Sequence, residues 1–145
     1  MNKLLLVLLI LSINFSFAQE EDGGILLSSE SANGKGITPL WPKCEDSRQT
    51  PINCFNNNLR NHIIKIFRYP EAAREEGLEG TITVEFIINK KGKVEVIDVK
   101  DGHRYLQREA VRIIKTIPKM DEPAKWGNKP ISVAYTVPIT FIKPK

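Results

Sequence analysis

Apolar and polar residues alternate along two stretches of the chain, residues 81–88 and 131–142, and this alternation predicts two half-buried β-strands. Residues 94–99 are predicted as a third strand, the return strand of a hairpin that begins with residues 81–88. Between residues 81–88 and 94–99 lies Asn89-Lys90-Lys91-Gly92. Gly92 can adopt a positive φ, so we expect it to close a hairpin.

Three other segments are predicted to be helical, two of them because apolar residues recur there at helical spacing. Residues 56–68 predict an amphipathic helix, capped by the asparagines at 56–58 and ended by Pro70. A shorter helix is expected over residues 71–76, with Gly77 as its left-handed C-cap. A third is predicted over residues 105–116 and ends at Pro118. Its apolar stripe comprises Leu106, Ala110, Ile113, Ile114 and Ile117.

The predicted order is therefore helix, helix, strand, strand, helix, strand, with a loop at 118–130. The simplest arrangement is an α+β fold, in which a three-stranded antiparallel sheet has its helices packed on one face. The third strand then lies beside the first, so the strand order is 2-1-3. This order makes the third strand an edge of the sheet.

The N-terminus has the pattern of a secretory signal peptide. Lys3 precedes an apolar run over residues 4–17, and small residues at Ser16 and Ala18 flank Phe17 before Gln19. The run is shorter than the roughly 18 residues expected of a membrane span. We therefore expect cleavage between Ala18 and Gln19, and a periplasmic location; the alternative is an uncleaved anchor.

Four segments follow from this pattern: a signal peptide at 1–18, a disordered leader at 19–38, a cysteine segment at 39–57 and a folded domain at 58–143. The leader is polar and glycine-rich except for Ile25-Leu26-Leu27. Cys44 and Cys54 enter an oxidising compartment and are expected to form a disulfide. Free thiols are the alternative, since the chain lacks a Cys-x-x-Cys redox motif.

The chain offers little that points to catalysis, metal binding or nucleic acid. Its 21 basic and 17 acidic residues are interleaved, so no basic stripe for nucleic acid forms. His62 and His103 have no second ligand at metal-binding spacing. Nucleophile elbows and phosphate-binding glycine loops are absent from the sequence. We expect no enzyme, no cofactor, no metal and no small-molecule substrate, and Trp41 and Trp126 are either recognition anchors or lids on the core.

From about residue 58 to residue 141, the spacing of glycine, proline and aromatic residues resembles that of the C-terminal domain of the TonB family. The residues that carry the resemblance are Tyr69-Pro70-Glu71-Ala72-Ala73, Gly77, Gly80, Phe86, Gly92, Ala110, Pro118 and the run from Val133 to Phe141. The resemblance implies a periplasmic module that binds a short segment of an outer-membrane transporter by main-chain strand pairing. Through this pairing, energy-dependent transport would be coupled to an inner-membrane motor.

Carried onto this chain, the resemblance places the contact on the third strand, ahead of Pro138. The expected peptide-binding residues are Ile131, Ser132, Val133, Ala134, Tyr135, Thr136 and Val137. Pro138 has no amide hydrogen, so an edge strand tolerates it only where its nitrogen points off the sheet.

Two departures from the family pattern favour a second interpretation. Neither an anchor nor a Pro-rich spacer is visible, and Ile66-Phe67, just before Tyr69-Pro70, is apolar and expected in the core, whereas better-known members are polar there. The chain could instead be a stand-alone interaction or structural module of the envelope, including a homodimer formed edge to edge.

Overall fold

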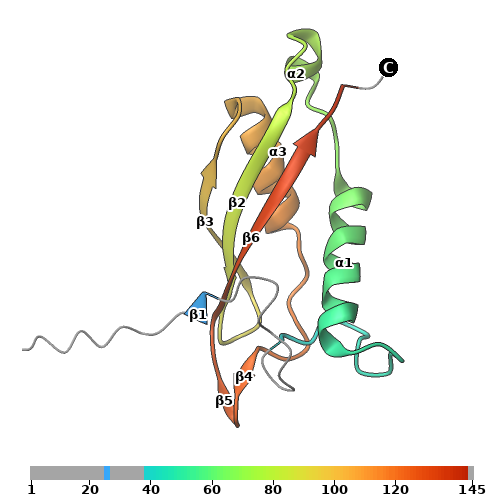
Figure 1. The fold of residues 1–145 in the computed structure, drawn as a ribbon, viewed down its shortest axis with the longest axis vertical. Coiled ribbons are helices and arrows are strands. Elements are labelled where there is room, and N and C mark those ends of the chain that lie inside the picture. Colours follow the sequence, from blue (N-terminus) through green and yellow to red (C-terminus); the bar gives the residue numbers. More distant parts are fainter. Residues whose placement is uncertain (1–24, 27–37, 144–145) are drawn as a thin grey trace, which may run out of the picture.

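The computed structural model describes residues 25–26 and 38–143, and Figure 1 shows their arrangement. The predicted signal peptide and its cleavage position lie outside the described residues. The elements run in the order β1 (Ile25–Leu26), α1 (Pro51–Ile66), α2 (Glu71–Glu75), β2 (Gly80–Ile88), β3 (Val94–Lys100), α3 (Arg104–Lys115), β4 (Lys125–Trp126), β5 (Lys129–Pro130) and β6 (Val133–Phe141).

The main sheet has the strand order β1-β6-β2-β3. β2 pairs antiparallel with β6 along its whole length, from Gly80 opposite Phe141 to Ile88 opposite Val133, and antiparallel with β3 on its other side. These three long strands confirm the predicted antiparallel sheet and its order. The sequence did not predict the short β1, which pairs in parallel with the outer side of β6.

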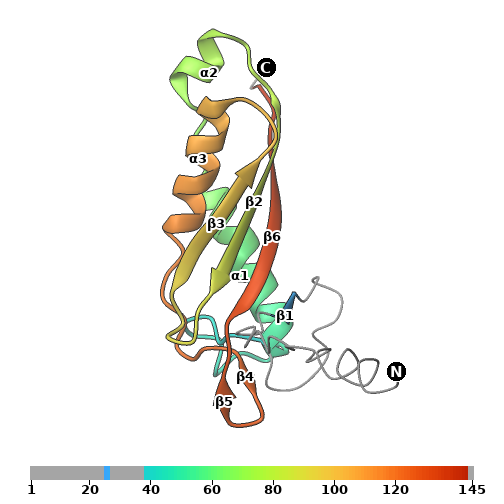
Figure 2. The same cartoon turned by 90° about the vertical axis from the view of Figure 1, so that its left-hand side faces the viewer.

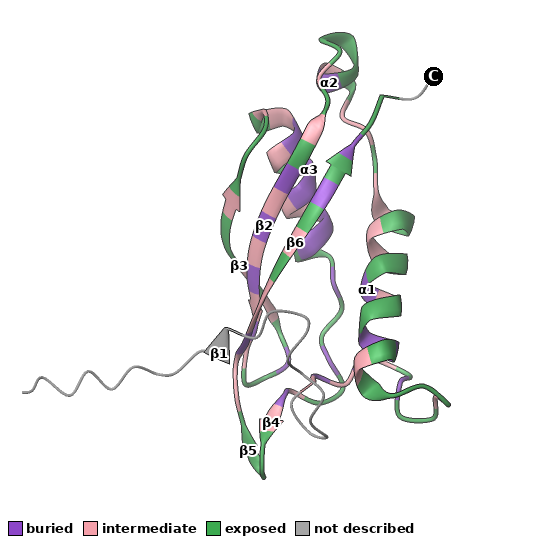
Figure 3. Ribbon diagram, in the orientation of Figure 1, coloured by how far each residue is buried: buried purple, intermediate pink, exposed green. Residues whose placement is uncertain are grey.

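The helices cover one face of the sheet, as predicted. Figure 2 shows α3 beside β3 and β2. α1 contacts α3, and its Phe55 packs on Tyr135 of β6. In Figure 3, buried positions alternate with intermediate ones along most of β2, and β6 carries buried, intermediate and exposed positions. The core between the layers is apolar and includes Phe55, Leu59, Ile82, Val84, Phe86, Ile88, Leu106, Ala110, Ile113, Ile114, Ile139 and Phe141.

Helix α1 begins earlier than the sequence analysis predicted. Its N-cap is Thr50, whose hydroxyl accepts a hydrogen bond from the amide of Asn53 at 3.4 Å, and Pro51 occupies the first helical position. Both are favourable at a helix start, because they leave fewer orphan amides to satisfy. The asparagines expected as caps therefore lie inside the helix, and the second half of the cysteine segment forms its first turns.

The segment predicted as a loop at 118–130 contains the small hairpin β4–β5, and it also connects distant parts of the chain. The amide of Leu40 donates to the carbonyl of Glu122 at 2.9 Å, and the amide of Asp121 donates to Leu40 at 2.8 Å. Met120 donates to Gly92 in the β2–β3 turn at 2.8 Å. Gly92 has the expected positive φ, at 77°. The N-terminal segment from residue 38 is thus fastened to the domain.

Within the described residues, no helix is both long enough and apolar enough to cross a membrane.

Candidate strand-binding edge

The outer side of β6 is the candidate functional site, because most of it has no neighbouring strand among the described residues. β2 covers one side of β6 from Val133 to Phe141, whereas β1 covers the other side only opposite Val133 and Ala134. Figure 1 shows β1 beside the start of β6. An unpaired strand edge presents a row of backbone N–H and C=O groups that another chain can complete.

The two outer strands of the long antiparallel sheet differ in chemistry. β3 carries Glu95, Asp98 and Lys100, and its register with β2 shifts where Glu85 faces Asp98 and Phe86 faces Val96. This shift leaves Ile97 as an extra, bulged residue whose side chain is 59% exposed. Charges and bulges are features that discourage the addition of a further strand. β6 has neither a charged residue nor a register shift.

The first two residues of the predicted site lie outside β6. Ile131 and Ser132 precede β6, and the amide of Ile131 already donates to the carbonyl of Ala124 at 2.8 Å. That amide is therefore not available to a partner. Val133, Ala134, Tyr135, Thr136 and Val137 lie in β6, so five of the seven predicted residues are in strand geometry.

Tyr135 holds the site onto the core. Its ring stacks between Phe55 of α1, with centroids 5.0 Å apart, and Phe86 of β2, at 5.4 Å. Burial raises the pKa of the Tyr135 hydroxyl well above its ordinary value. The side chain of Tyr135 faces the core, whereas that of the next residue, Thr136, is exposed.

Pro138 does not end the strand on the β2 side. It lies opposite Thr83, and the pairing continues to Phe141. An unbroken ladder on that side fits a proline nitrogen that faces away from β2, toward the open edge. The uncovered side of β6 would therefore lack a donor at Pro138, so a partner strand gains most from the residues before it.

An open apolar groove of ≈ 400 Å³ lies between α1 and the last residues of β6. Its walls include Ile63, Ile64 and Phe67 from the helix side and Ile139 and Ile142 from the strand side. The side chains of Ile64 and Ile142 are 64% and 71% exposed. Phe67 was expected in the core. It does pack on Phe141, at 5.1 Å between centroids, but it is only partly buried and also lines the groove.

Sequence reasoning missed Ile64 and Ile142, because each breaks the periodicity of its own element. Ile64 lies beside the predicted apolar stripe of α1, and Ile142 follows the last alternating strand position. An apolar residue out of phase with an amphipathic pattern was the available signal.

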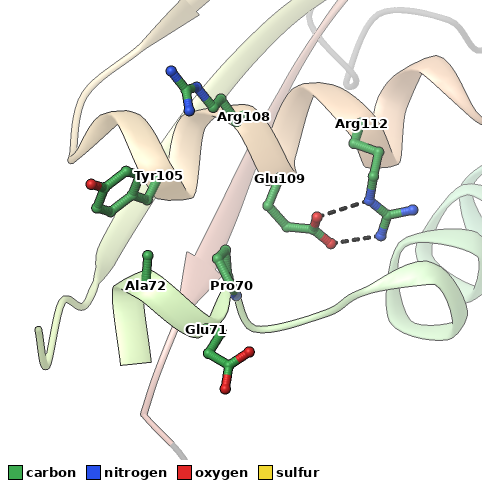
Figure 4. A pocket seen from close by; sticks show the side chains of 7 residues that line it. All are labelled: Pro70, Glu71, Ala72, Tyr105, Arg108, Glu109 and Arg112. Carbon is green, nitrogen blue, oxygen red and sulfur yellow. Dashed lines mark hydrogen bonds and ion pairs between the residues drawn. The ribbon is translucent and has the colours of Figure 1, made fainter. Parts of the chain in front are cut away.

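A second hollow, of ≈ 390 Å³, lies between α2 and α3 and is shown in Figure 4. Its charged groups are engaged within the protein. Glu109 is buried and accepts hydrogen bonds from Arg112 Nη2 at 2.6 Å, Arg112 Nε at 2.8 Å and the amide of Arg68 at 2.9 Å. Arg112 also donates to the carbonyl of Ile66 at 2.7 Å. The pairing with Glu109 raises the pKa of the Arg112 guanidinium. This cluster joins α3 to the α1–α2 connection.

The cysteines form the predicted disulfide, with Cα atoms 6.0 Å apart. Cys54 lies in the first turns of α1, and the side-chain amide of Asn58 donates to the carbonyl of Cys54 at 2.8 Å. The bridge therefore fastens the segment before α1 to that helix.

The two histidines have structural partners. Nε2 of His62 lies 3.0 Å from the carbonyl oxygen of Ile113, which ties α1 to α3. His103 is the N-cap of α3, where its Nδ1 accepts from the amide of Tyr105 at 3.2 Å. Among the described residues, no group of three or more His, Cys, Asp and Glu side chains is placed to hold a metal ion.

The tryptophans have different environments. Trp41 is buried and meets Phe55 edge to face at 5.7 Å, so it covers the core. Trp126 is 62% exposed at the β4–β5 hairpin.

Comparison with known families shows to which family the chain belongs. Residues 66–142 match the family model described as Gram-negative bacterial TonB protein C-terminal. The chain belongs to this family. The match includes α2, β2, β3, α3 and β6, and therefore the whole candidate edge. No curated protein matches.

Two solved structures of the TonB C-terminal domain from Helicobacter pylori are similar to this chain. For the solution structure of residues 179–285, the identity is 25%, the TM-score is 0.47, and the alignment covers 64% of this chain and 84% of that one. For residues 194–285 the identity is 26%, the TM-score is 0.41, and the coverage is 61% and 92%.

Membership in the TonB C-terminal family gives the chain a coarse functional class. The family is a protein-interaction family of the cell envelope, associated with transport and with outer-membrane proteins. The long antiparallel sheet with its uncovered β6 edge is the part of the present structure that suits such an interaction.

Proposed function

We propose that this TonB-like domain binds an extended peptide of an outer-membrane transporter in the periplasm, by strand pairing on the outer edge of β6. The pairing would link the chain to energy-dependent transport. The contact is assigned to Val133, Ala134, Tyr135, Thr136 and Val137. Backbone hydrogen bonds then supply most of the affinity, and side chains discriminate only modestly between peptides.

The contrast between the two outer strands is the observation that carries this proposal. β3 has three charged residues and a bulge, whereas the nine residues of β6 carry no charge. A sheet with no partner to bind is expected to carry charges or a bulge on both edges, because these features prevent pairing with another chain. The β1 pairing adds support, because it is an example of a strand accommodated at this side of β6.

The groove beside the end of β6 favours a partner with apolar side chains. Ile64 and Ile142 are exposed there next to the partly buried Phe67. A peptide that extends past Pro138 could cover them, and each apolar contact contributes about 25 cal/mol per Å² removed from water.

Amide hydrogen exchange tests the proposal directly. In the presence of a peptide from the periplasmic N-terminus of an outer-membrane transporter from the same organism, residues 133–137 should exchange more slowly. The turn at residues 89–92 should not change, and it serves as an internal control. Protection of β3 in place of β6, or no protection with any such peptide, would contradict the proposal.

The alternative, an envelope module without energy transduction, can use the same edge in a homodimer, because an uncharged strand can pair with its own copy. In that case residues 133–137 become more protected as the protein concentration rises, with no peptide present. Sedimentation velocity over the same concentration range separates a dimer from a monomer that binds peptide.

A further inference from the structure

Two residues of the chain's own N-terminal segment already pair with the edge that the proposed function assigns to a partner. Ile25 lies opposite Val133 and Leu26 opposite Ala134, and the strands run parallel. We propose that β1 is an internal competitor, which occupies the start of the β6 edge until a longer extended segment displaces it. The inference rests on the proposed function, in that it concerns regulation of the same edge.

The length of β1 suits a displaceable occupant better than a permanent strand. β1 has two residues, whereas β2 and β6 have nine each, and strands in globular proteins usually have 3–10. Among the residues that the structure describes, no strand pairs with the outer side of β6 from Tyr135 onward. A longer segment can therefore pair first with the uncovered part and then replace β1 at Val133 and Ala134.

The connection to the domain explains how so short a strand can compete. The amide of Leu40 donates to Glu122, and the Cys44–Cys54 disulfide follows, so the chain is fixed shortly after β1. Residues 27–37 link β1 to this anchored part of the same chain. Two segments joined by a short linker meet at an effective concentration on the order of millimolar, so even weak pairing becomes significant.

The sequence around β1 resembles a minimal strand-forming ligand. Ile25-Leu26-Leu27 follows Gly23-Gly24 and precedes Ser28-Ser29-Glu30, so one apolar triplet stands in a polar segment. While β1 is paired, it also covers part of an uncharged edge that could otherwise join a second copy.

If β1 competes with a partner for the edge, the partner should bind with a measurably larger apparent dissociation constant. The apparent dissociation constant equals the intrinsic one divided by the fraction of molecules with a free edge. If β1 occupies the edge in most molecules, its removal should strengthen binding by about threefold to tenfold.

The test compares three full-length chains. Ile25→Pro combined with Leu26→Pro removes both amides of β1, and Ser31→Pro is the matched control, with a proline in the same segment but outside β1. The substitutions leave every residue of the described core between sheet and helices unchanged, so all three chains should keep the same slow exchange in β2. The first measurement is amide exchange at residues 133–135 without ligand. The second is the affinity of a synthetic peptide with the sequence of residues 23–31, added as a separate molecule.

The inference predicts faster exchange at residues 133–135 and about threefold to tenfold tighter peptide binding in the double-proline chain only. Equal exchange or equal affinity in all three chains would overturn it. A transporter peptide, tested in parallel, separates this inference from the proposed function. If the 23–31 peptide behaves as predicted and no transporter peptide binds, the internal competitor stands and the proposed partner is wrong. If a transporter peptide protects β6 equally in all three chains, the partner stands and the competitor is wrong.

Discussion

At Glu109, a carboxylate lies where the apolar stripe of α3 meets the connection between α1 and α2. It accepts three hydrogen bonds, two from Arg112 and one from the amide of Arg68. Neither partner was apparent from the sequence, where Glu109 read as one polar position among others on an amphipathic helix. A carboxylate three residues before an arginine was the only local signal. The contact with Arg68 depends on tertiary structure, which periodicity does not encode.

Replacement of Glu109 by Ala should lower the free energy of unfolding by about 2–3 kcal/mol. The loss removes the acceptor of the Arg68 amide and the carboxylate partner of Arg112. The Arg112 guanidinium keeps its bond to the carbonyl of Ile66 and, at 37% exposed, can partly return to water. Urea denaturation measures the change, with Arg108→Ala as the control on an exposed position of the same helix, expected within about 0.5 kcal/mol. Equal stability of the two variants would show that the cluster is not structural.

Gly102 provides a second residue-scale prediction. Its φ is +62°, and a Cβ built on it would lie 2.3 Å from Cδ1 of the buried Ile82. Gly77 has nearly the same φ, +65°, with nothing within 4 Å of a built Cβ. Gly77→Ala should cost about 1 kcal/mol from backbone strain alone. Gly102→Ala should cost about 1–2 kcal/mol more, because Ile82 must move. Thermal unfolding of both variants measures the difference, and equal losses would contradict the close approach.

At the scale of elements, strands were predicted better than the beginnings of helices. The alternation in β2 and β6 reflects a sheet with one buried face, and β3 followed from the hairpin turn. Each strand lies within a few residues of its prediction. The start of α1 was predicted too late, because the cysteines marked residues 39–57 as a loop and the Thr50-Pro51 start signal was overlooked. β1 could not be predicted from local pattern, since a two-residue strand exists only through its pairing with β6.

The disulfide is an element-scale feature, since it joins the segment before α1 to its first turns. It closes a short loop, with Cys44 and Cys54 ten positions apart. The chain-entropy model gives about 3 kcal/mol for such a loop, and less if the reduced segment frays while the sheet stays folded. Urea unfolding of the Cys44→Ser, Cys54→Ser double variant should show a loss up to this size. Thiol titration of the denatured wild type should find no free thiol, and two thiols per chain would contradict the bridge.

At the scale of the whole molecule, the two outer strands divide the sheet into a protected side and a receptive side. The sequence alone placed the third strand at an edge and the resemblance gave it a role. The protection of β3 depends on the register shift at Ile97, which becomes visible only when β2 and β3 are paired. The groove between α1 and Ile142 likewise joins residues from distant parts of the chain. The contrast between β3 and β6 and the groove beside β6 therefore depend on the tertiary fold, which local sequence patterns do not show.

The most direct test of the central claim is the position of a bound peptide strand in solution. The isotopically labelled chain, in complex with an unlabelled transporter N-terminal peptide, gives nuclear Overhauser contacts between backbone protons of neighbouring strands. The account predicts a continuous series of such contacts between the peptide and residues 133–137 of β6, with β1 displaced if the internal competitor is correct. Contacts between the peptide and residues 94–100 of β3, or a peptide that contacts neither strand, would contradict it.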